Sequence, residues 1–311
     1  MKKAVLFGLV ITAATLAASD AGSWIDAAGG SVIRDQGGRI VAVNLRASWV
    51  TDADLPDLAR LPDLSRLDLS LTRITDRGLQ QLKAASNLTE LNLYYAELIT
   101  DQGLAVVKSL KKLKRLNVRG TKASDSTLAF LSSVPSLESL DIGYGQVTDV
   151  GLAQLTAPNL KELAIGGNKL TDNGLQALRK MTALTVLDLS GAQRTDSGLW
   201  SISLTEAGLD SISMLRDLRH LRLNGTAITD LGLEKLKVLS HLERLDLQSC
   251  ARVTDAAAAT IESLSSLRMV DVTGTKMTAD GLAALHRAEP KLTVLHADFD
   301  YTKPARRGPA Q

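Results

Sequence analysis

Few side chains in this chain have the types and spacing that metal binding or nucleophilic catalysis requires. The 311 residues include four histidines and one cysteine, Cys250. Two histidines, His220 and His296, fall in segments that alternate like strands, whereas His241 falls in a loop and His286 in a helical segment. Metal coordination and catalysis need such groups to converge, and no Gly-x-Ser-x-Gly or His-Glu-x-x-His motif is present. The sequence predicts a protein that is not an enzyme and has no metal and no cofactor.

Aspartate is more common and forms two recurring sets. One set follows a threonine at the start of each expected helix, where a carboxylate interacts favourably with the helix dipole: Asp52, Asp76, Asp101, Asp149, Asp172, Asp196, Asp230 and Asp255. The other set lies in mid-strand and points outward: Asp68, Asp141, Asp188, Asp246 and Asp271. The second set makes the strand face polar and soluble; the alternative is that it recognises a cationic partner.

Both sets are in register because one pattern recurs about every 24 residues. Its first half, Leu-x-x-Leu-x-Leu, has the two-residue period of a half-buried strand. Its second half, Ile/Val-Thr-Asp-x-Gly-Leu-x-x-Leu, begins with residues that cap a helix and continues with leucines on one side of that helix. One such strand and helix cannot bury their own apolar faces, so neighbouring copies must stack. The copies begin at Ile40, Leu64, Leu88, Leu113, Leu137, Leu160, Leu184, Leu218, Leu242, Leu267 and Leu292.

This pattern resembles leucine-rich repeats, in particular the ribonuclease-inhibitor-like and cysteine-containing subclasses. The resemblance covers residues 40–299, roughly five-sixths of the chain. It implies an α/β leucine-rich repeat solenoid, a horseshoe with a parallel sheet on the concave face and short helices on the convex face. The family's Asn/Cys position is filled here by Ser48, Thr72, Thr121, Asn168, Thr226, Cys250 and Thr275. Cys250 is therefore expected to be a buried, reduced structural thiol.

The N-terminus has the layout of a bacterial secretory signal peptide. Lys2 and Lys3 precede an apolar run at residues 4–18, and the small residues Ser19 and Ala21 follow it. This predicts a signal peptide over residues 1–21, a secreted or periplasmic mature protein, and membrane contact only transiently through that peptide. The alternative is an uncleaved anchor, for which the run is short.

The segments that flank the repeats differ from them in composition. Residues 22–39 are expected to form an N-terminal cap, with a helical turn at 24–28 and a hairpin that pairs residues 31–34 with 40–43. Residues 300–311 are rich in proline and arginine and are expected to be a disordered tail.

One insertion interrupts the period. Leu184 and Leu218 are 34 residues apart, and residues 195–204 are a near-copy of residues 205–214. We interpret this as an extra helical half-repeat at 195–214, which would form a longer or doubled helix on the convex side. The alternative is a protrusion that carries Trp200 to a partner.

A third recurring position lies just after each strand and is mostly glycine: Gly120, Gly167, Gly191, Gly225 and Gly274. Such repetition indicates a backbone conformation that other residues enter at a cost, or a close approach of chains. Tyr95 and Tyr144 interrupt this column, although aromatic residues make up only 3% of the chain. With Tyr94, Arg115 and Arg119 they form the predicted partner-binding site; the alternative is a surface cluster with no partner.

The net charge of +2 gives no general attraction to nucleic acid or to membranes. By analogy with the family, we expect a non-catalytic protein-protein interaction scaffold, exported from a bacterial cell, that binds a protein partner through its concave face. A glycan-binding or cell-envelope ligand-binding module is the alternative. A ubiquitin-ligase-type substrate receptor is a remote one, because the chain has no F-box segment.

Overall fold

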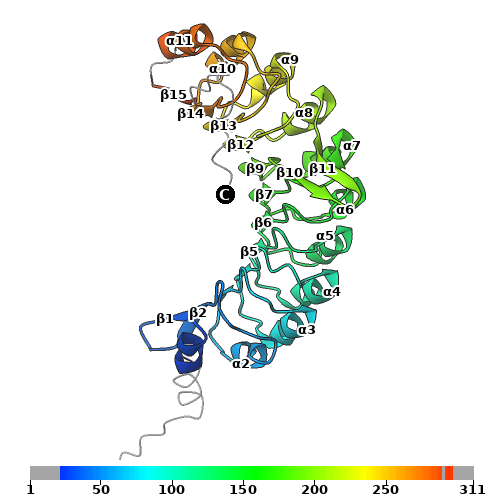
Figure 1. Ribbon diagram of the computed structural model, residues 1–311, viewed down its shortest axis with the longest axis vertical. Coiled ribbons are helices and arrows are strands. Elements are labelled where there is room, and N and C mark those ends of the chain that lie inside the picture. Colours follow the sequence, from blue (N-terminus) through cyan, green and yellow to red (C-terminus); the bar gives the residue numbers. More distant parts are fainter. Residues whose placement is uncertain (1–21, 289–290, 297–311) are drawn as a thin grey trace, which may run out of the picture. The chain divides into compact units, whose positions relative to one another are not determined.

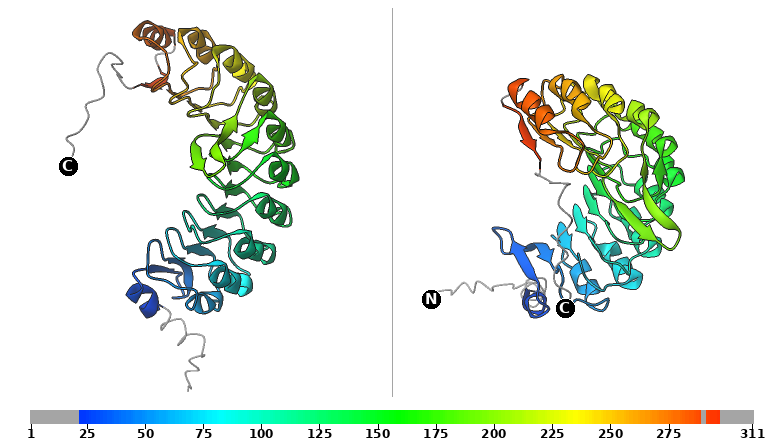
Figure 2. Two further views of the ribbon diagram at one scale, coloured as in Figure 1. Left: turned by 45° about the vertical axis from the view of Figure 1, so that its right-hand side comes forward. Right: turned by 45° about the horizontal axis from the view of Figure 1, so that its top comes forward.

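The computed structural model describes residues 22–288 and 291–296. The chain consists of two units, Met1–Leu160 and Lys161–Gln311, called here the N-terminal and C-terminal units. In each unit short parallel strands line one side and short helices the other (Figures 1 and 2). The predicted signal peptide and the predicted tail lie outside the described residues.

In the N-terminal unit the strands follow one another in chain order: β1 (Ser31–Arg34), β2 (Ile40–Asn44), β3 (Arg66–Asp68), β4 (Glu90–Asn92), β5 (Arg115–Asn117) and β6 (Ser139–Asp141). All pairs from β2 onward are parallel, and equivalent residues of the repeat face each other, as Leu67 faces Leu91 and Leu91 faces Leu116. The helices are α2 (Leu55–Ala59), α3 (Asp76–Leu79), η1 (Gln80–Ala84), α4 (Asp101–Leu104), η2 (Ala105–Ser109), α5 (Asp125–Leu131) and α6 (Asp149–Gln154).

The C-terminal unit repeats this arrangement. Its main sheet contains β7 (Glu162–Ala164), β9 (Val186–Asp188), β12 (His220–Arg222), β13 (Arg244–Asp246), β14 (Met269–Asp271) and β15 (Thr293–Leu295). Its helices are α7 (Asp172–Leu175), η3 (Gln176–Lys180), α8 (Glu206–Ile212), α9 (Asp230–Leu233), η4 (Glu234–Val238), η5 (Asp255–Ala257), α10 (Ala258–Glu262) and α11 (Ala279–Ala288).

The leucines of the repeat form the core, as the pattern predicts. In the copy that begins at Leu88, the residues Leu88, Leu91 and Leu93 are at most 2% exposed, and Ile99 and Leu104 of the same copy are fully buried. Each fully buried leucine contributes roughly 2 kcal/mol relative to an exposed one. Because each repeat has only a few such residues, the stability of the fold comes from the stack.

The predicted N-terminal hairpin is present. Residues 22–27 are helical, and their Ile25 is fully buried. β1 then pairs antiparallel with β2, with Val32 opposite Val43. This segment places an antiparallel strand beside the first strand of the parallel array.

The insertion at 195–214 does not form the doubled helix expected from its sequence. β10 (Ala192–Thr195) and β11 (Gly198–Ser203) form an antiparallel hairpin, and β11 pairs in parallel with β8 (Leu170–Thr171), so only residues 206–212 become a helix. A second helical half-repeat that lacks its own strand cannot pack its apolar side chains into the core of the stack. In the extended conformation Ile202 and Leu204 are buried instead, at 5% and 3% exposed, and Leu199 points to solvent.

The helix-start threonines cap their helices as predicted. The Thr75 side chain, for example, accepts a hydrogen bond from the N–H of Arg77. Asp196 is the exception among the aspartates of that set, since it lies in the β10–β11 turn and not at a helix start.

The aspartates at the helix starts have a further role that the sequence did not reveal. At seven helix starts the aspartate accepts two hydrogen bonds from the capping residue of the next repeat: Thr100 donates its N–H and its hydroxyl to Asp76, and Thr254 donates both to Asp230. The same pairing joins Asp52 to Thr75, Asp101 to Ser124, Asp125 to Thr148, Asp172 to Thr205 and Asp255 to Thr278. We call this set the Asp–Thr ladder.

The ladder also explains the glycine of the Thr-Asp-x-Gly-Leu motif. A Cβ placed at Gly103 would lie 2.4 Å from a carboxylate oxygen of Asp76, and one at Gly78 would lie 2.2 Å from that of Asp52. The glycine therefore leaves room for the carboxylate of the preceding repeat.

Candidate partner-binding site

The position just after the parallel strand of each repeat, as far as β14, has a left-handed backbone conformation, as the recurring glycines predict. In the N-terminal unit its residues and φ angles are Ala47 (52°), Leu71 (58°), Tyr95 (51°), Gly120 (71°) and Tyr144 (53°). In the C-terminal unit they are Gly167, Gly191, Gly225, Ser249 and Gly274, all with positive φ. A side chain raises the free energy of this conformation by about 1 kcal/mol. We call this set the left-handed column.

Hydrogen bonds between neighbouring repeats hold the column in place. The N–H of Leu71 donates to the carbonyl of Tyr94 and the N–H of Tyr95 to that of Arg119, each at 2.8 Å. The N–H of Gly120 continues the series to the carbonyl of Gly143 at 2.9 Å. The backbone is thus the same whether the residue is glycine or tyrosine, and only the side chain presented at the sheet edge differs.

Tyr94 and Tyr95 form one aromatic pair at this edge. Their ring centroids are 4.6 Å apart and the rings are inclined by 64°, an edge-to-face arrangement. The Tyr95 ring lies over the next residue of the column, since a Cβ at Gly120 would meet it at 2.9 Å. All three tyrosines of the predicted site, Tyr144 included, are partly exposed.

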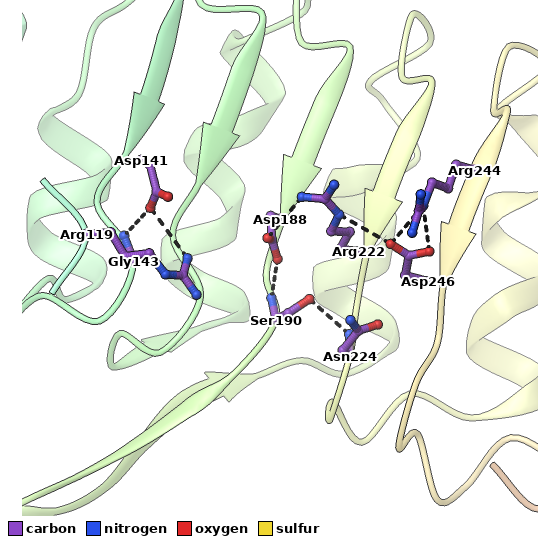
Figure 3. A network of polar contacts seen from close by, with 9 residues as sticks. All are labelled: Arg119, Asp141, Gly143, Asp188, Ser190, Arg222, Asn224, Arg244 and Asp246. Atoms are coloured by element: carbon purple, nitrogen blue, oxygen red, sulfur yellow. Dashed lines mark hydrogen bonds and ion pairs between the residues drawn. The ribbon is translucent and has the colours of Figure 1, made fainter. Parts of the chain in front are cut away.

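Arg119 joins the third tyrosine to the sheet. Its guanidinium carbon lies 4.5 Å from the centroid of the Tyr144 ring. Its Nη1 lies 3.6 Å from Asp141, as Figure 3 shows. Arg115 projects from β5 and is exposed, with its Nε 4.0 Å from Glu90 on the neighbouring strand. The structure therefore groups the predicted residues as a Tyr94–Tyr95 pair, an Arg119–Tyr144 pair and an arginine that forms an ion pair with a neighbouring strand.

The mid-strand aspartates are engaged by their own chain. Asp68, Asp141 and Asp188 each accept a hydrogen bond of 2.8 to 2.9 Å from the N–H two residues later, which closes the turn after the strand. Sequence reasoning missed this local role, although an aspartate two residues before a turn residue is a common sign of it. The structure thus assigns these carboxylates to turn formation, and it does not favour the alternative role, recognition of a cationic partner.

In the C-terminal unit the strand-face charges neutralise one another. Arg222 lies between Asp188, at 3.5 Å, and Asp246, at 3.3 Å, and Arg244 lies 2.9 Å from the same Asp246 (Figure 3). Asp246 is only 3% exposed. Its carboxylate is compensated by two arginines of the same unit, so this face offers no free acidic group at that point.

Cys250 occupies the turn position that its place in the repeat predicts. It is fully buried, and its Sγ lies 3.2 Å from the carbonyl oxygen of Leu223 and 3.7 Å from the hydroxyl of Thr226. Burial raises the pKa of the Cys250 thiol above its ordinary value. The thiol is therefore protonated at neutral pH. It occupies the position of the threonine hydroxyl of other copies but donates to the preceding repeat, whereas Thr121 donates to the carbonyl of Val118 in its own repeat.

Two further findings concern the described residues only. Within residues 22–288 and 291–296 there is no group of three or more His, Cys, Asp or Glu side chains that could hold a metal ion. In that same part of the chain, no helix has the length and apolar character needed to cross a membrane.

Five segments of the chain match the family model described as Leucine Rich repeat: residues 61–83, 135–155, 156–178, 215–237 and 238–261. The fold is a leucine-rich repeat solenoid. No curated protein sequence matches the chain. The strand, turn and helix of these five segments are thus shared with a known class of repeat.

Solved leucine-rich repeat structures resemble this one. An internalin (inlF) from Listeria monocytogenes has a TM-score of 0.55 and 24% identity, over 78% of this chain and 70% of that chain. An internalin C2 from the same organism has a TM-score of 0.51 and 25% identity, over 84% of this chain and 92% of that chain. The ectodomain of the Arabidopsis receptor kinase HAESA, solved with a peptide hormone ligand, has a TM-score of 0.53 and 19% identity, over 79% of this chain and 40% of that chain.

Proposed function

We propose that this leucine-rich repeat protein is a non-catalytic scaffold that binds a protein partner, and that Tyr94, Tyr95, Arg115, Arg119 and Tyr144 form its binding site on the sheet side of the N-terminal unit. One observation carries the proposal. In the left-handed column, where the C-terminal unit has glycine at four of five positions, the N-terminal unit has tyrosine twice. The left-handed conformation of Tyr95 and Tyr144 raises the free energy of the folded state, and neither side chain is buried in the core in return. A role of these side chains at the surface explains why they are tolerated there.

The residue types support the same conclusion. Tyrosine and arginine contribute large contact areas and directed hydrogen bonds with limited loss of side-chain freedom, so they often dominate the binding energy of protein interfaces. Contacts within the chain already hold these residues in place. The rings of Tyr94 and Tyr95 pack against each other, the N–H of Tyr95 donates to the carbonyl of Arg119, and the Arg119 guanidinium lies over the Tyr144 ring. This order before binding lowers the entropic cost of binding. Leucine-rich repeat proteins commonly bind protein partners, and the HAESA ectodomain was solved with a peptide hormone.

The test replaces Tyr95 and Tyr144 by glycine, the residue best suited to their backbone conformation. The free energy of unfolding of the Tyr95→Gly/Tyr144→Gly variant should lie within about 1 kcal/mol of the parent's, because glycine adopts the left-handed conformation more easily and this offsets the lost ring contacts. Its capture of the partner from cell-envelope proteins should fall at least tenfold, about 1.4 kcal/mol. The matched control is Ser249→Gly in the C-terminal unit, a glycine substitution at the same backbone position.

Three results would contradict the proposal. Undiminished capture by the double glycine variant would place the binding surface elsewhere. Equal loss with Ser249→Gly would mean that the column acts through stability. Binding to a glycan array, with no protein captured, would favour the glycan-binding alternative.

We further propose that the protein is exported as a bacterial, ribonuclease-inhibitor-like or cysteine-containing repeat protein, with residues 1–21 as its signal peptide and residues 22–39 as its N-terminal cap. The charge and apolar pattern of the N-terminus supports export, and the buried Ile25 beside the β1–β2 hairpin supports the cap. N-terminal sequencing of exported protein should find a start at Asp20 or Gly22. Retention of Met1 in a membrane fraction would contradict cleavage.

A further inference from the structure

The exposed apolar surface of the N-terminal unit extends beyond the tyrosines toward β2. Trp49, Leu71 and Leu98 lie in the turns that follow β2, β3 and β4, and they are 88%, 42% and 43% exposed. Single exposed apolar residues are ordinary on protein surfaces, but a row of them in successive repeats, beside two tyrosines, marks an interaction surface. We call Trp49, Leu71, Tyr94, Tyr95 and Leu98 the apolar edge.

Hydrogen bonds and ring contacts connect this edge across the repeats. Arg46, in the turn after β2, donates from Nη1 to the hydroxyl of Ser70 at 3.3 Å, and its guanidinium lies 5.9 Å from the Tyr94 ring centroid. The backbone of the next turn is fixed by the bond from Leu71 to Tyr94. The apolar edge follows three neighbouring strands, β2 to β4, and is roughly 10 Å long, which matches about three residues of extended peptide.

The charge on the apolar edge is unbalanced. Arg46, Arg73 and Lys122 are exposed, and within the described residues none of them forms an ion pair. The adjacent carboxylates are engaged: Asp68 accepts from the N–H of Ser70 and from the Asn92 amide at 2.9 Å, and Asp141 lies beside Arg119. Glu97 is the exposed carboxylate in this row of turns. Three exposed cationic side chains and one exposed carboxylate therefore give this row of turns a positive charge, which favours an acidic ligand.

We infer that the apolar edge binds an extended, acidic segment of polypeptide, whose apolar side chains lie on Leu71, Tyr95 and Trp49 and whose carboxylates face Arg46, Arg73 and Lys122. This inference rests on the proposed function and names the chemistry of the partner. Arginine suits the role because its planar guanidinium binds a carboxylate through two parallel hydrogen bonds. On the strand face of the C-terminal unit, by contrast, Arg222 and Arg244 lie beside aspartates of the same unit.

The probe is a displayed library of random 12-residue peptides selected on the full chain. Enriched peptides should combine Asp or Glu with Leu, Phe or Trp and be poor in Lys and Arg. Synthetic copies, measured by fluorescence anisotropy, should bind more weakly as salt increases. The Arg46→Glu/Arg73→Glu variant should lose at least tenfold in affinity for them, and it should gain affinity for copies in which lysine replaces each acidic residue. The matched control is Arg77→Glu, an exposed arginine on α3 away from this row, which should change the affinity less than twofold.

The outcomes separate this inference from the proposed function. Peptides that bind without preference for acidic residues, yet lose binding in Tyr95→Gly/Tyr144→Gly, would overturn the acidic partner and leave the proposed site intact. Acidic peptides that lose binding in Arg46→Glu/Arg73→Glu but not in the double glycine variant would support the acidic surface and contradict the tyrosine site. No enrichment, or equal loss in Arg77→Glu, would overturn the inference.

Discussion

Thr100 donates its backbone N–H to one carboxylate oxygen of Asp76 and its hydroxyl to the other, at 2.8 and 2.6 Å, across 24 residues of chain. The threonine at the same time caps its own helix by accepting from the N–H of Gln102. One side chain thus caps the start of a helix, and through its hydroxyl proton it binds the preceding repeat. The Asp–Thr ladder is therefore a polar seam on the helix side, complementary to the leucine core.

Replacement of Asp76 by alanine should destabilise the N-terminal unit. The N–H and hydroxyl of Thr100 would lose their acceptor in a partly buried place, which costs roughly 2 kcal/mol. Urea unfolding monitored by circular dichroism measures this change. The control Glu97→Ala removes an exposed carboxylate outside the ladder and should stay within about 0.5 kcal/mol of the parent. A loss of unfolding free energy no larger than that of Glu97→Ala would show that the ladder hydrogen bonds do not stabilise the fold.

Gly103→Ala should be costlier than an ordinary glycine substitution in a helix. Its Cβ would lie 2.4 Å from the Asp76 carboxylate and 2.9 Å from the Asp76 Cα, so the two repeats must move apart. We expect a loss of about 2 to 3 kcal/mol. In an Asp76→Ala background the added loss should be smaller, because only the backbone contact remains. Additive losses in this double-mutant cycle would exclude the carboxylate as the cause.

The thiol of Cys250 should react slowly with a labelling reagent in native buffer and quickly in denaturant. Because burial raises its pKa, the folded state favours the protonated thiol. Stability should be constant below the ordinary thiol pKa and should fall as the pH rises from there toward the raised value, since only the unfolded chain then ionises. Cys250→Thr should abolish this alkaline loss and fold normally, whereas Cys250→Asp should destabilise by several kcal/mol. Rapid native labelling would refute the burial.

Deletion of residues 192–201 should leave the fold intact. It removes β10 and most of β11 and returns the spacing between Leu184 and Leu218 from 34 to 24 residues, the length of the other repeats. Ile202, which enters the core, is retained. The midpoint of thermal unfolding should shift by only a few degrees, a change of about 1 kcal/mol. Loss of cooperative unfolding would show that the hairpin is integral to the C-terminal unit.

The sequence predicted the features that each repeat determines by itself. The two-residue alternation of Leu67-Asp68-Leu69 gives a strand, the Thr-Asp pair gives a capped helix start, and the recurring glycine marks a left-handed residue. The same register placed Cys250 correctly in a buried turn. These features depend on the local chain and on the repetition of one environment, both of which can be read along the sequence.

The features that were missed depend on a partner elsewhere in the chain. Residues 195–204 are a near-copy of the segment that forms α8. The pairing of Ile202 with Leu170 and the turn at Asp196 and Ser197 nevertheless make them a hairpin. The Asp–Thr ladder was hidden for a similar reason, because each carboxylate meets a residue one repeat away. The recurring glycine of the helix start, as at Gly78, Gly103 and Gly151, was the available signal, since it marks where the carboxylate of the preceding repeat needs space.

The ladder also bears on how the chain folds. Its hydrogen bonds join residues only 23 or 24 positions apart, except across the insertion, where Thr205 meets Asp172 over 33 positions. Contacts of such short range favour fast, stepwise growth from any folded pair of repeats. By loop-closure entropy the longer segment adds only about 0.3 kcal/mol to that single step. A solenoid joined in this way can acquire a new surface segment between two repeats with almost no kinetic penalty, which makes the turn after β9 a natural place for such a chain to diversify.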